Sequence, residues 1–222
     1  MAWYRCGLNG GGGGGGTGKK VPTFSETLIM DNSAEGTTLA FTADWGNYTL
    51  LKVRLKNTST GDILDIYTTP QFIADAKQYS NGRATFNFPV GDTYVTYTVN
   101  NYGTDWVQYG TRNSVVTHIY GLTCTNYTMQ IDTIYRRQGI GSTLVTVTSQ
   151  DSLYDYDYLI IATNTSSYGA TEPMSYLVPA EAPTNIQPII LYNYYNGSGS
   201  FVLSEYGMTA GRFFVVQGMK LT

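Results

Sequence analysis

The sequence is poor in charge, cysteine and histidine. Only 13% of its 222 residues are charged, and the formal net charge of −3 leaves no basic face of the kind that binds a nucleic-acid backbone. Two cysteines, Cys6 and Cys124, are too few and too far apart for a disulfide-rich secreted scaffold. A bond between them stays open as an alternative, but we expect both to be free thiols.

Long apolar stretches are also lacking. No run approaches the ~20 apolar residues of a membrane-spanning helix, and residues 1–9 lack the apolar core and cleavage site of a signal peptide. We therefore expect a protein that is made in a cytoplasm, stays soluble and has neither a membrane nor a nucleic acid as partner.

Thr, Tyr, Asn, Ser and Gly dominate instead, and they favour short strands joined by tight turns. Leu51, Val53 and Leu55 alternate with three cationic residues, which predicts a strand with one buried face. Similar alternation occurs in 84–88 and 95–99, and turn sequences such as 80–82 and 196–199 separate the strands. Only 71–78 suggests a short helical turn. The fold class we predict is all-β.

Three segments recur in order about 100 residues later, which indicates an internal repeat. Residues 36–42 resemble 141–147, residues 48–53 resemble 156–161, and residues 115–122 resemble 212–219. Chance similarity between Thr-rich strands is the alternative. The repeat predicts two tandem antiparallel β-sandwich domains, immunoglobulin-like or jelly-roll-like, at 23–122 and 123–222, behind a glycine-rich arm at 1–22.

The arm carries the most distinctive pattern of the chain. Two aromatic residues, Trp3 and Tyr4, precede seven consecutive glycines: Gly10, Gly11, Gly12, Gly13, Gly14, Gly15 and Gly16. Glycine loses more conformational freedom on ordering than any other residue, so such a run needs an external partner to become fixed. We expect the aromatic pair to anchor the arm on that partner and the glycines to pack where no side chain fits; a flexible linker is the alternative.

No catalytic, cofactor or metal site is predicted. Residues 13–19 match most of a phosphate-binding loop, but Lys20 stands where a Ser or Thr should hold magnesium and no helix follows. His118 is the only histidine and has no recognisable nucleophile, which favours a structural role. Asp151, Asp155 and Asp157 alternate with tyrosines. Alternation at period two would put them on a strand face that points to solvent, and we expect a plain acidic loop; a structural or weak calcium-binding role and glycoside hydrolysis by a carboxylate pair are the alternatives.

Aromatic residues in polar loops give the one positive signal for ligand binding. Trp45 and Tyr48 form one candidate pair, and Tyr102 and Trp106 form the other. Such residues stack on sugar rings or serve as protein hot spots, but tryptophans buried between two sheets are the commoner alternative.

A Trp-Tyr-Arg-Cys leader, a polyglycine tract and tandem β domains together resemble structural proteins of tailed bacteriophages and prophages. The resemblance implies a non-enzymatic virion component, assembled in the bacterial cytoplasm as a homo-oligomer and docked to other virion proteins by its arm. It implies a tail-tip or fibre protein that touches a host-surface glycan, or alternatively a capsid decoration or head-fibre protein. A polysaccharide-degrading enzyme is the second alternative.

Overall fold

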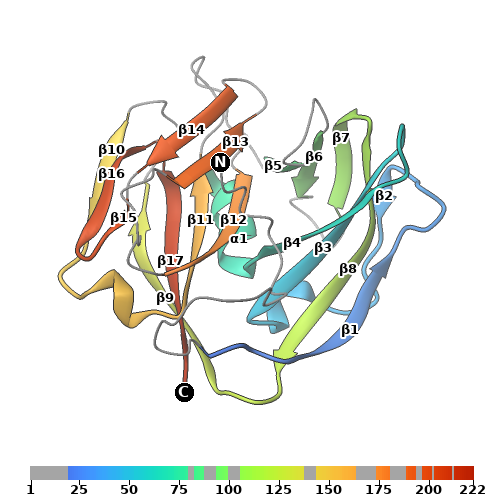
Figure 1. Ribbon diagram of the computed structural model, residues 1–222. Coiled ribbons are helices and arrows are strands. Elements are labelled where there is room, and N and C mark those ends of the chain that lie inside the picture. Colours follow the sequence, from blue (N-terminus) through green and yellow to red (C-terminus); the bar gives the residue numbers. More distant parts are fainter. Residues whose placement is uncertain are drawn as a thin grey trace.

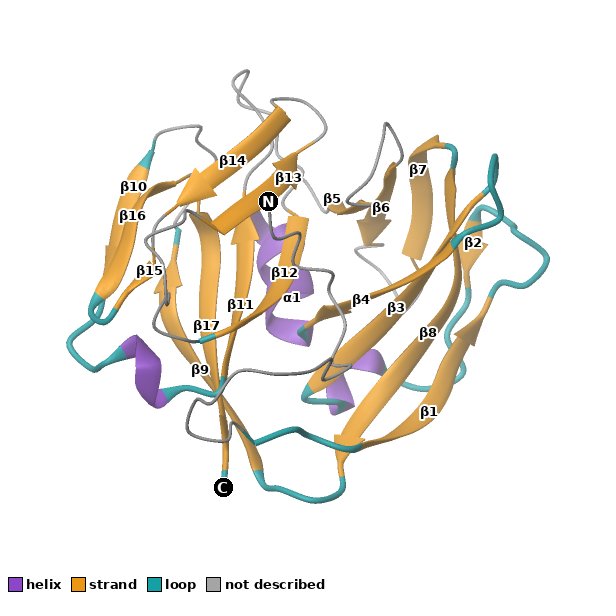
Figure 2. Ribbon diagram, viewed as in Figure 1, coloured by secondary structure: helices purple, strands orange, loops and turns teal. Residues whose placement is uncertain are grey.

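The computed structural model describes residues 20–79, 83–87, 94–99, 106–137, 144–163, 174–180, 189–193, 197–201, 203–211 and 213–222. Strands dominate this part of the chain, which confirms the all-β class (Figure 2). The strands are β1 Phe24–Asp31, β2 Thr38–Leu39, β3 Leu50–Asn57, β4 Ile63–Thr68, β5 Arg83–Asn87, β6 Tyr94–Val99, β7 Trp106–Arg112, β8 Ser114–Cys124, β9 Met129–Arg136, β10 Val145–Thr148, β11 Tyr158–Thr163, β12 Met174–Pro179, β13 Ile189–Asn193, β14 Gly197–Phe201, β15 Leu203–Ser204, β16 Gly207–Gly211 and β17 Phe213–Leu221. The helices are η1 Trp45–Asn47, α1 Pro70–Tyr79 and η2 Leu153–Asp155.

Residues 24–124, here called the first half, form two layers of strands. One sheet has the order β1-β8-β3-β4, and the other runs β2-β7-β6-β5. The apolar core between them includes Leu39, Leu51, Val53, Trp106 and Ile119, all with no exposed surface. The burial predicted for Leu51, Val53 and Leu55 is thus confirmed, although Lys52 on the opposite face is buried as well.

Residues 129–222, the second half, contain the strand series β12-β11-β17-β9. It corresponds to β4-β3-β8-β1 of the first half. The strands β10, β16 and β15 pair with one another, as do β13 and β14. A second apolar core here includes Val147, Leu153, Leu159, Met208 and Phe213. One parallel bridge, Thr85 to Met174, joins β5 to β12, so a single sheet of eight strands runs through both halves (Figure 1).

The two halves share strand order, register and irregularities. Leu51 of β3 lies opposite Gly121 of β8, and Leu159 of β11 lies opposite Gly218 of β17. The register of β3 with β8 shifts between Arg54 and Leu55, and that of β11 with β17 shifts at the equivalent step after Ala162. The edge strands β1 and β9 each carry a bulge at the same distance from these glycines. The similarity therefore extends to individual backbone positions.

A tyrosine packed on a glycine recurs in both halves. Each short helix, η1 or η2, ends at a tyrosine, Tyr48 or Tyr156, whose N–H bonds back to the helix at 3.4 Å. An added Cβ would lie 2.4 Å from the Tyr48 ring at Gly121 and 2.4 Å from the Tyr156 ring at Gly218. Glycine is therefore required at both positions, because each ring occupies the place of a side chain.

Helix α1 is longer than the turn expected at 71–78, because its N-terminus is well capped. The hydroxyl of Thr69 accepts a hydrogen bond of 3.1 Å from the N–H of Phe72, and Pro70 occupies the first helical position. Phe72 and Ile73 are buried in the same apolar cluster as Ala162 and Val215 of the second half. A helix of the first half thus packs on the second. No helix in the described ranges has the length and apolar character needed to cross a membrane.

The aspartates at 151–157 lie in a turn, as expected for an acidic loop, and not along a strand. Ser152 caps η2 by accepting a hydrogen bond from the N–H of Tyr154 at 3.2 Å, so the chain turns here instead of forming a strand. Asp151 and Asp155 are exposed around this turn, whereas Asp157 is partly buried and its Oδ2 accepts from the N–H of Leu221 at 2.8 Å. The three carboxylates therefore do not share one strand face.

The repeated contact predicts that Gly121→Ala and Gly218→Ala each destabilise the protein. Overpacking of a filled site costs about 1–3 kcal/mol, because the ring or the strand must move. Gly36→Ala is the control, since its Cβ would meet Asn32 at 3.4 Å, close to an ordinary contact. Chemical denaturation measures the free energy of unfolding of each variant. If Gly121→Ala and Gly218→Ala were as stable as Gly36→Ala, the Tyr–Gly packing would be contradicted.

Candidate functional site: the seam and the root of the arm

An apolar seam joins the two halves. We use this name for the buried cluster of Leu50, Leu122, Ile160, Met219 and Leu221. Strand alternation explains it, because these side chains lie on the sheet faces that point away from the two internal cores. Equivalent positions of the two halves belong to this cluster together: Leu122 and Met219, Leu50 and Tyr158, and Phe24 and Met129. Both halves thus contribute the same sheet positions to the seam.

Two polar contacts extend the seam. The buried hydroxyl of Thr69, at the start of α1, donates a hydrogen bond of 2.7 Å to Oε1 of Gln217 on β17. Asp75 of α1 is fully buried and forms an ion pair with Arg136 of β9, whose side chain is partly exposed. Gln71 also donates to Asp75 Oδ1 at 2.8 Å. Both contacts cross between the halves and fix the position of α1.

Burial raises the pKa of the Asp75 carboxyl, while the hydrogen bond from Gln71 and the charge of Arg136 oppose that shift. Its Oδ2 has no hydrogen-bond partner in the described residues. An ionised Asp75 is therefore tolerated in the core chiefly because Gln71 and Arg136 compensate its charge.

The root of the arm, defined as residues 20–23, is bound at the lower end of this seam. Asn126 holds it through two hydrogen bonds: its Oδ1 accepts from the N–H of Thr23 at 2.7 Å, and its Nδ2 donates to Val21 O at 3.0 Å. The ammonium of Lys20 donates to Leu221 O and lies 5.8 Å from the centroid of the Tyr127 ring. Tyr158 donates to Lys20 O at 3.4 Å. The root is therefore held by the connection between the halves and by the second half.

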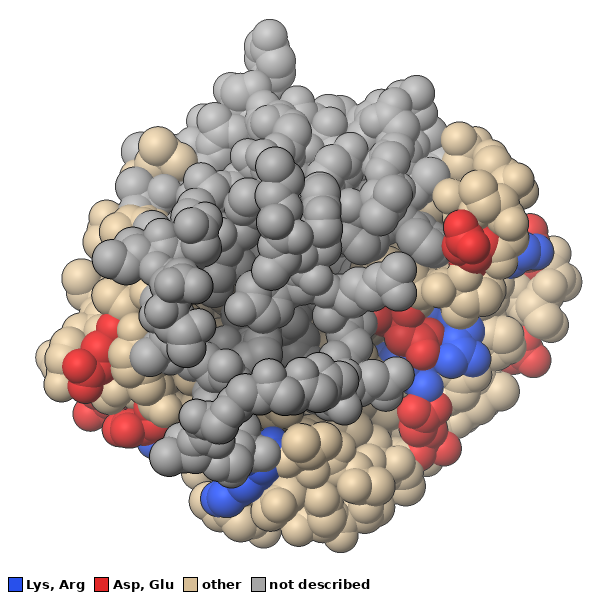
Figure 3. Space-filling view, in the orientation of Figure 1, with Lys and Arg blue, Asp and Glu red and all other residues tan. Residues whose placement is uncertain are grey.

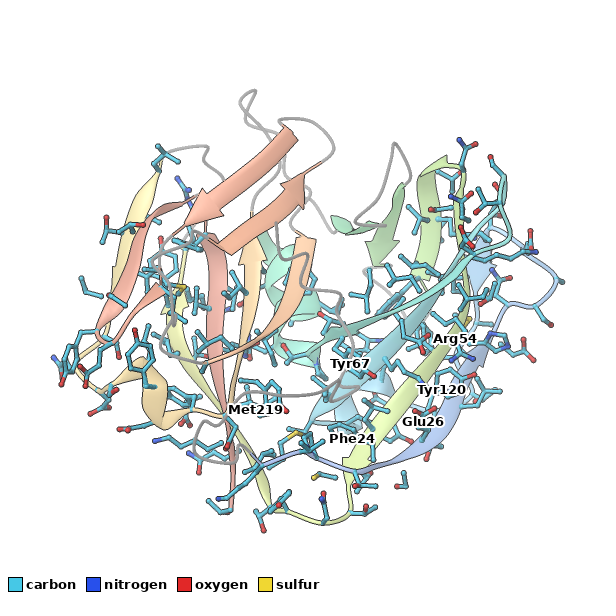
Figure 4. All side chains as sticks on the ribbon, in the orientation of Figure 1. Phe24, Glu26, Arg54, Tyr67, Tyr120 and Met219 are labelled. Carbon is cyan, nitrogen blue, oxygen red and sulfur yellow. The ribbon has the colours of Figure 1, made fainter. Side chains whose placement is uncertain are left out.

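A ladder of ion pairs covers the outer face of the sheet β1-β8-β3-β4. The Lys52 ammonium contacts Glu26 and lies 4.3 Å from the centroid of the Tyr120 ring. Arg54 donates from Nε and Nη2 to the two carboxylate oxygens of Asp65, each at 2.8 Å, which raises the pKa of the guanidinium. Figure 4 shows Glu26, Arg54 and Tyr120 on this face, with Phe24, Tyr67 and Met219 to their left, toward the seam.

These charges are paired with one another, so the ladder is a structural feature of the sheet. The equivalent positions in the second half show why the two faces differ. Ile160 and Ala162 stand where Lys52 and Arg54 stand in the first half, and both are buried. Ala162 packs in the cluster with α1, whereas the Arg54 side chain is 32% exposed; Lys52 is buried and keeps its charge through Glu26. The charged residues thus stand where a carboxylate partner is at hand, and apolar residues stand where the face packs on the protein.

The two tryptophans with a candidate ligand role lie in or against the core. Trp106 has no exposed surface, and its ring meets Phe41 and Trp45 edge-on at centroid distances of 5.0 and 5.7 Å. Trp45 and Tyr48 are half-buried, and the ring of Tyr48 covers Gly121. Tyr102 lies outside the described residues. The structure brings Trp45 and Trp106 together, but as a packing contact, and Trp106 offers no face for stacking on a sugar.

The other candidates occupy separate places. His118 is partly buried on β8, where its Nδ1 lies 3.0 Å from the Thr117 hydroxyl and its ring stacks beside Tyr120. Cys124 is a free thiol at the end of β8, beside the root. In the described part of the chain, no three His, Cys, Asp or Glu residues lie close enough to hold a metal ion. The predicted docking residues Trp3, Tyr4 and Gly10 to Gly16 lie outside the described residues, as does Cys6.

The Asp75–Arg136 pair predicts a pH-dependent cost for Arg136→Gln. Removing one partner of a buried pair costs about 3 kcal/mol, at the low end of the usual range because Arg136 is partly exposed. Because the pKa of Asp75 is raised, its neutral form is favoured in the folded state, and ionisation lowers stability as the pH rises through that pKa. The loss of unfolding free energy in Arg136→Gln relative to wild type should be largest near pH 8. It should shrink as the pH falls toward 3.8, the ordinary pKa of an aspartate carboxyl.

Denaturant unfolding of wild type and variant at both ends of this pH range measures the effect. Arg54→Gln is the control at a more exposed pair. A deficit for Arg136→Gln that does not change with pH would contradict the assignment to Asp75.

Comparison of the chain with protein-family models, with curated proteins and with solved structures finds no match.

Proposed function

We propose that this chain is a non-enzymatic structural component of a virion, of the tailed bacteriophage or prophage type that its sequence resembles. Its body consists of two diverged copies of one β-sandwich module, joined at the seam. Its glycine-rich arm, residues 1–22, docks the body to other virion proteins. The shared strand order, register and bulges of the two halves support the tandem modules.

The fixed root of the arm is the observation that carries this proposal. A flexible linker needs no defined attachment, yet residues 20–23 are held by Asn126 and by the last strand, β17. The root is thus attached both to the connection between the halves and to the second half. This arrangement suits a body that must be held in one orientation on a larger particle.

The buried tryptophan favours one location over the other. A tail-tip protein that binds host glycans through Trp45 and Trp106 needs these rings exposed, whereas a capsid decoration protein can keep them inside. Trp106 has no exposed surface and contacts Trp45, which supports the decoration role. We therefore place the chain on the capsid in preference to the tail tip.

Deletion of residues 1–18 should leave a folded body that no longer joins particles. The deletion spares the root, so the seam and both cores keep their contacts. Circular dichroism and thermal unfolding test the body, and the amount of protein in purified virions tests incorporation. The double variant Trp3→Ala/Tyr4→Ala keeps the glycines and separates aromatic anchoring from arm length.

Leu144→Asp is the matched control for the solvent-exposed body, since its side chain is 58% exposed and far from the root in sequence. It should be incorporated as the wild type is. Normal incorporation of the truncated protein would show that the arm is not the docking element.

A further inference from the structure

The surface around the arm root is built as a rigid platform. We call it the base and define it by the side chains of Val21, Phe24, Cys124, Tyr127, Met129 and Tyr158. Three segments meet there: the root, the connection between β8 and β9, and the end of β17. Thr125 donates its N–H to Thr23 O at 2.8 Å, and the backbones of Thr128 and Thr222 exchange two hydrogen bonds of 2.7 and 2.9 Å. The base therefore has a defined shape.

The segments of the base carry no acidic residue. Residues 20–25, 123–129 and 219–222 contain no aspartate or glutamate, and Asp157, next to Tyr158, is partly buried with its Oδ2 bonded to the N–H of Leu221. Val21 is 50% exposed, while the other five side chains of the base are partly buried and pack on the seam. The two lysines of these segments, Lys20 and Lys220, place their ammonium groups near the rings of Tyr127 and Tyr156.

The centres of protein interfaces are depleted of charge and enriched in aromatic residues and methionine. In Figure 3 the lower part of the visible described surface is mostly uncharged apart from one group of basic atoms at its left, whereas acidic and basic atoms mix over the ladder. The base thus differs from the charged face of the same sheet.

The length of the arm and its attachment beside the base indicate which protein covers this surface. Residues 1–19 precede the root and reach at most about 60–70 Å when fully extended. A protein that holds the arm is therefore tethered close to the base, at an effective concentration in the millimolar range for a short link. A weak apolar contact at the base then adds to the arm without having to bind alone.

We propose that the base is a second docking surface for the virion protein that holds the arm, with an apolar, uncharged patch as its counterpart. This inference rests on the proposed function. Docking then involves two contacts. The arm links the body to the virion protein, and the contact at the base, here called the seat, fixes the orientation of the body.

The double variant Val21→Asp/Thr128→Glu tests the seat. Both side chains are exposed, and the only hydrogen bonds described for these residues are made by backbone atoms, so the body should fold. Leu144→Asp/Thr146→Glu is the matched control, because it places the same charges on exposed residues at and beside β10. The probe is the virion produced without this chain, titrated with purified protein in a sedimentation assay.

We expect the base variant to bind at least 10-fold more weakly than wild type and the control to bind within twofold, with unchanged thermal unfolding of both. Binding of the base variant within twofold of wild type, while deletion of 1–18 abolishes binding, would overturn the seat and leave the arm proposal intact. Normal binding of the deletion would overturn the proposed function. Failure of the wild type to bind would overturn both.

A second measurement does not depend on a charged substitution. In a Cys6→Ser protein, alkylation of Cys124 by a maleimide should be at least fivefold slower on the virion than in free solution, because the seat covers the thiol. Equal rates in the two states would contradict a covered base even if both double variants bind normally.

Discussion

The packing of one sheet face against its counterpart is the contact on which the rest of this structure depends. Leu50 and Leu122 of the first half meet Ile160, Met219 and Leu221 of the second, and all five are buried. Each half has its own core, but the root of the arm, helix α1 and the C-terminal strand are all positioned relative to this seam. The seam joins two small β bodies into one, and the root of the arm is held beside it by the connection between the halves and by the second half.

The two halves also show how one backbone accommodates different surroundings. Strand order, bulges and the Tyr–Gly contact are kept, while the residues on the outer sheet faces diverge. Ala162 occupies the position on the sheet of the second half that packs in the cluster with α1. Its counterpart in the first half is Arg54, which is partly exposed to solvent and pairs with Asp65. The helix breaks the equivalence, because it belongs to the first half and packs on the second. The residues on each outer sheet face thus fit the contacts of that face, while the backbone of the two halves stays the same.

Local patterns in the sequence predicted the strands well. Alternation identified the buried face of β3. The turn predicted at 196–199 was wrong, because residues 197–199 pair with β13 as the first part of β14, and the turn at 80–82 lies outside the described residues. The repeat was visible because Gly121 and Gly218 stand at matching places in similar segments. Three features depend on contacts between residues far apart in the chain and could not be predicted in this way. Asp75 pairs with Arg136, Thr69 bonds Gln217, and Asn126 holds the root over a separation of about 100 residues. The tryptophans were ambiguous, because a loop sequence does not reveal whether an indole turns inward, as Trp106 does.

The account requires that the seam makes both halves one cooperative unit. Differential scanning calorimetry tests this directly, because two-state unfolding requires the calorimetric enthalpy to equal the van't Hoff enthalpy. A single transition with equal enthalpies over the whole chain is the predicted result. Two separate transitions, each with about half of the total enthalpy, would show that the halves unfold independently and would contradict the central role of the seam.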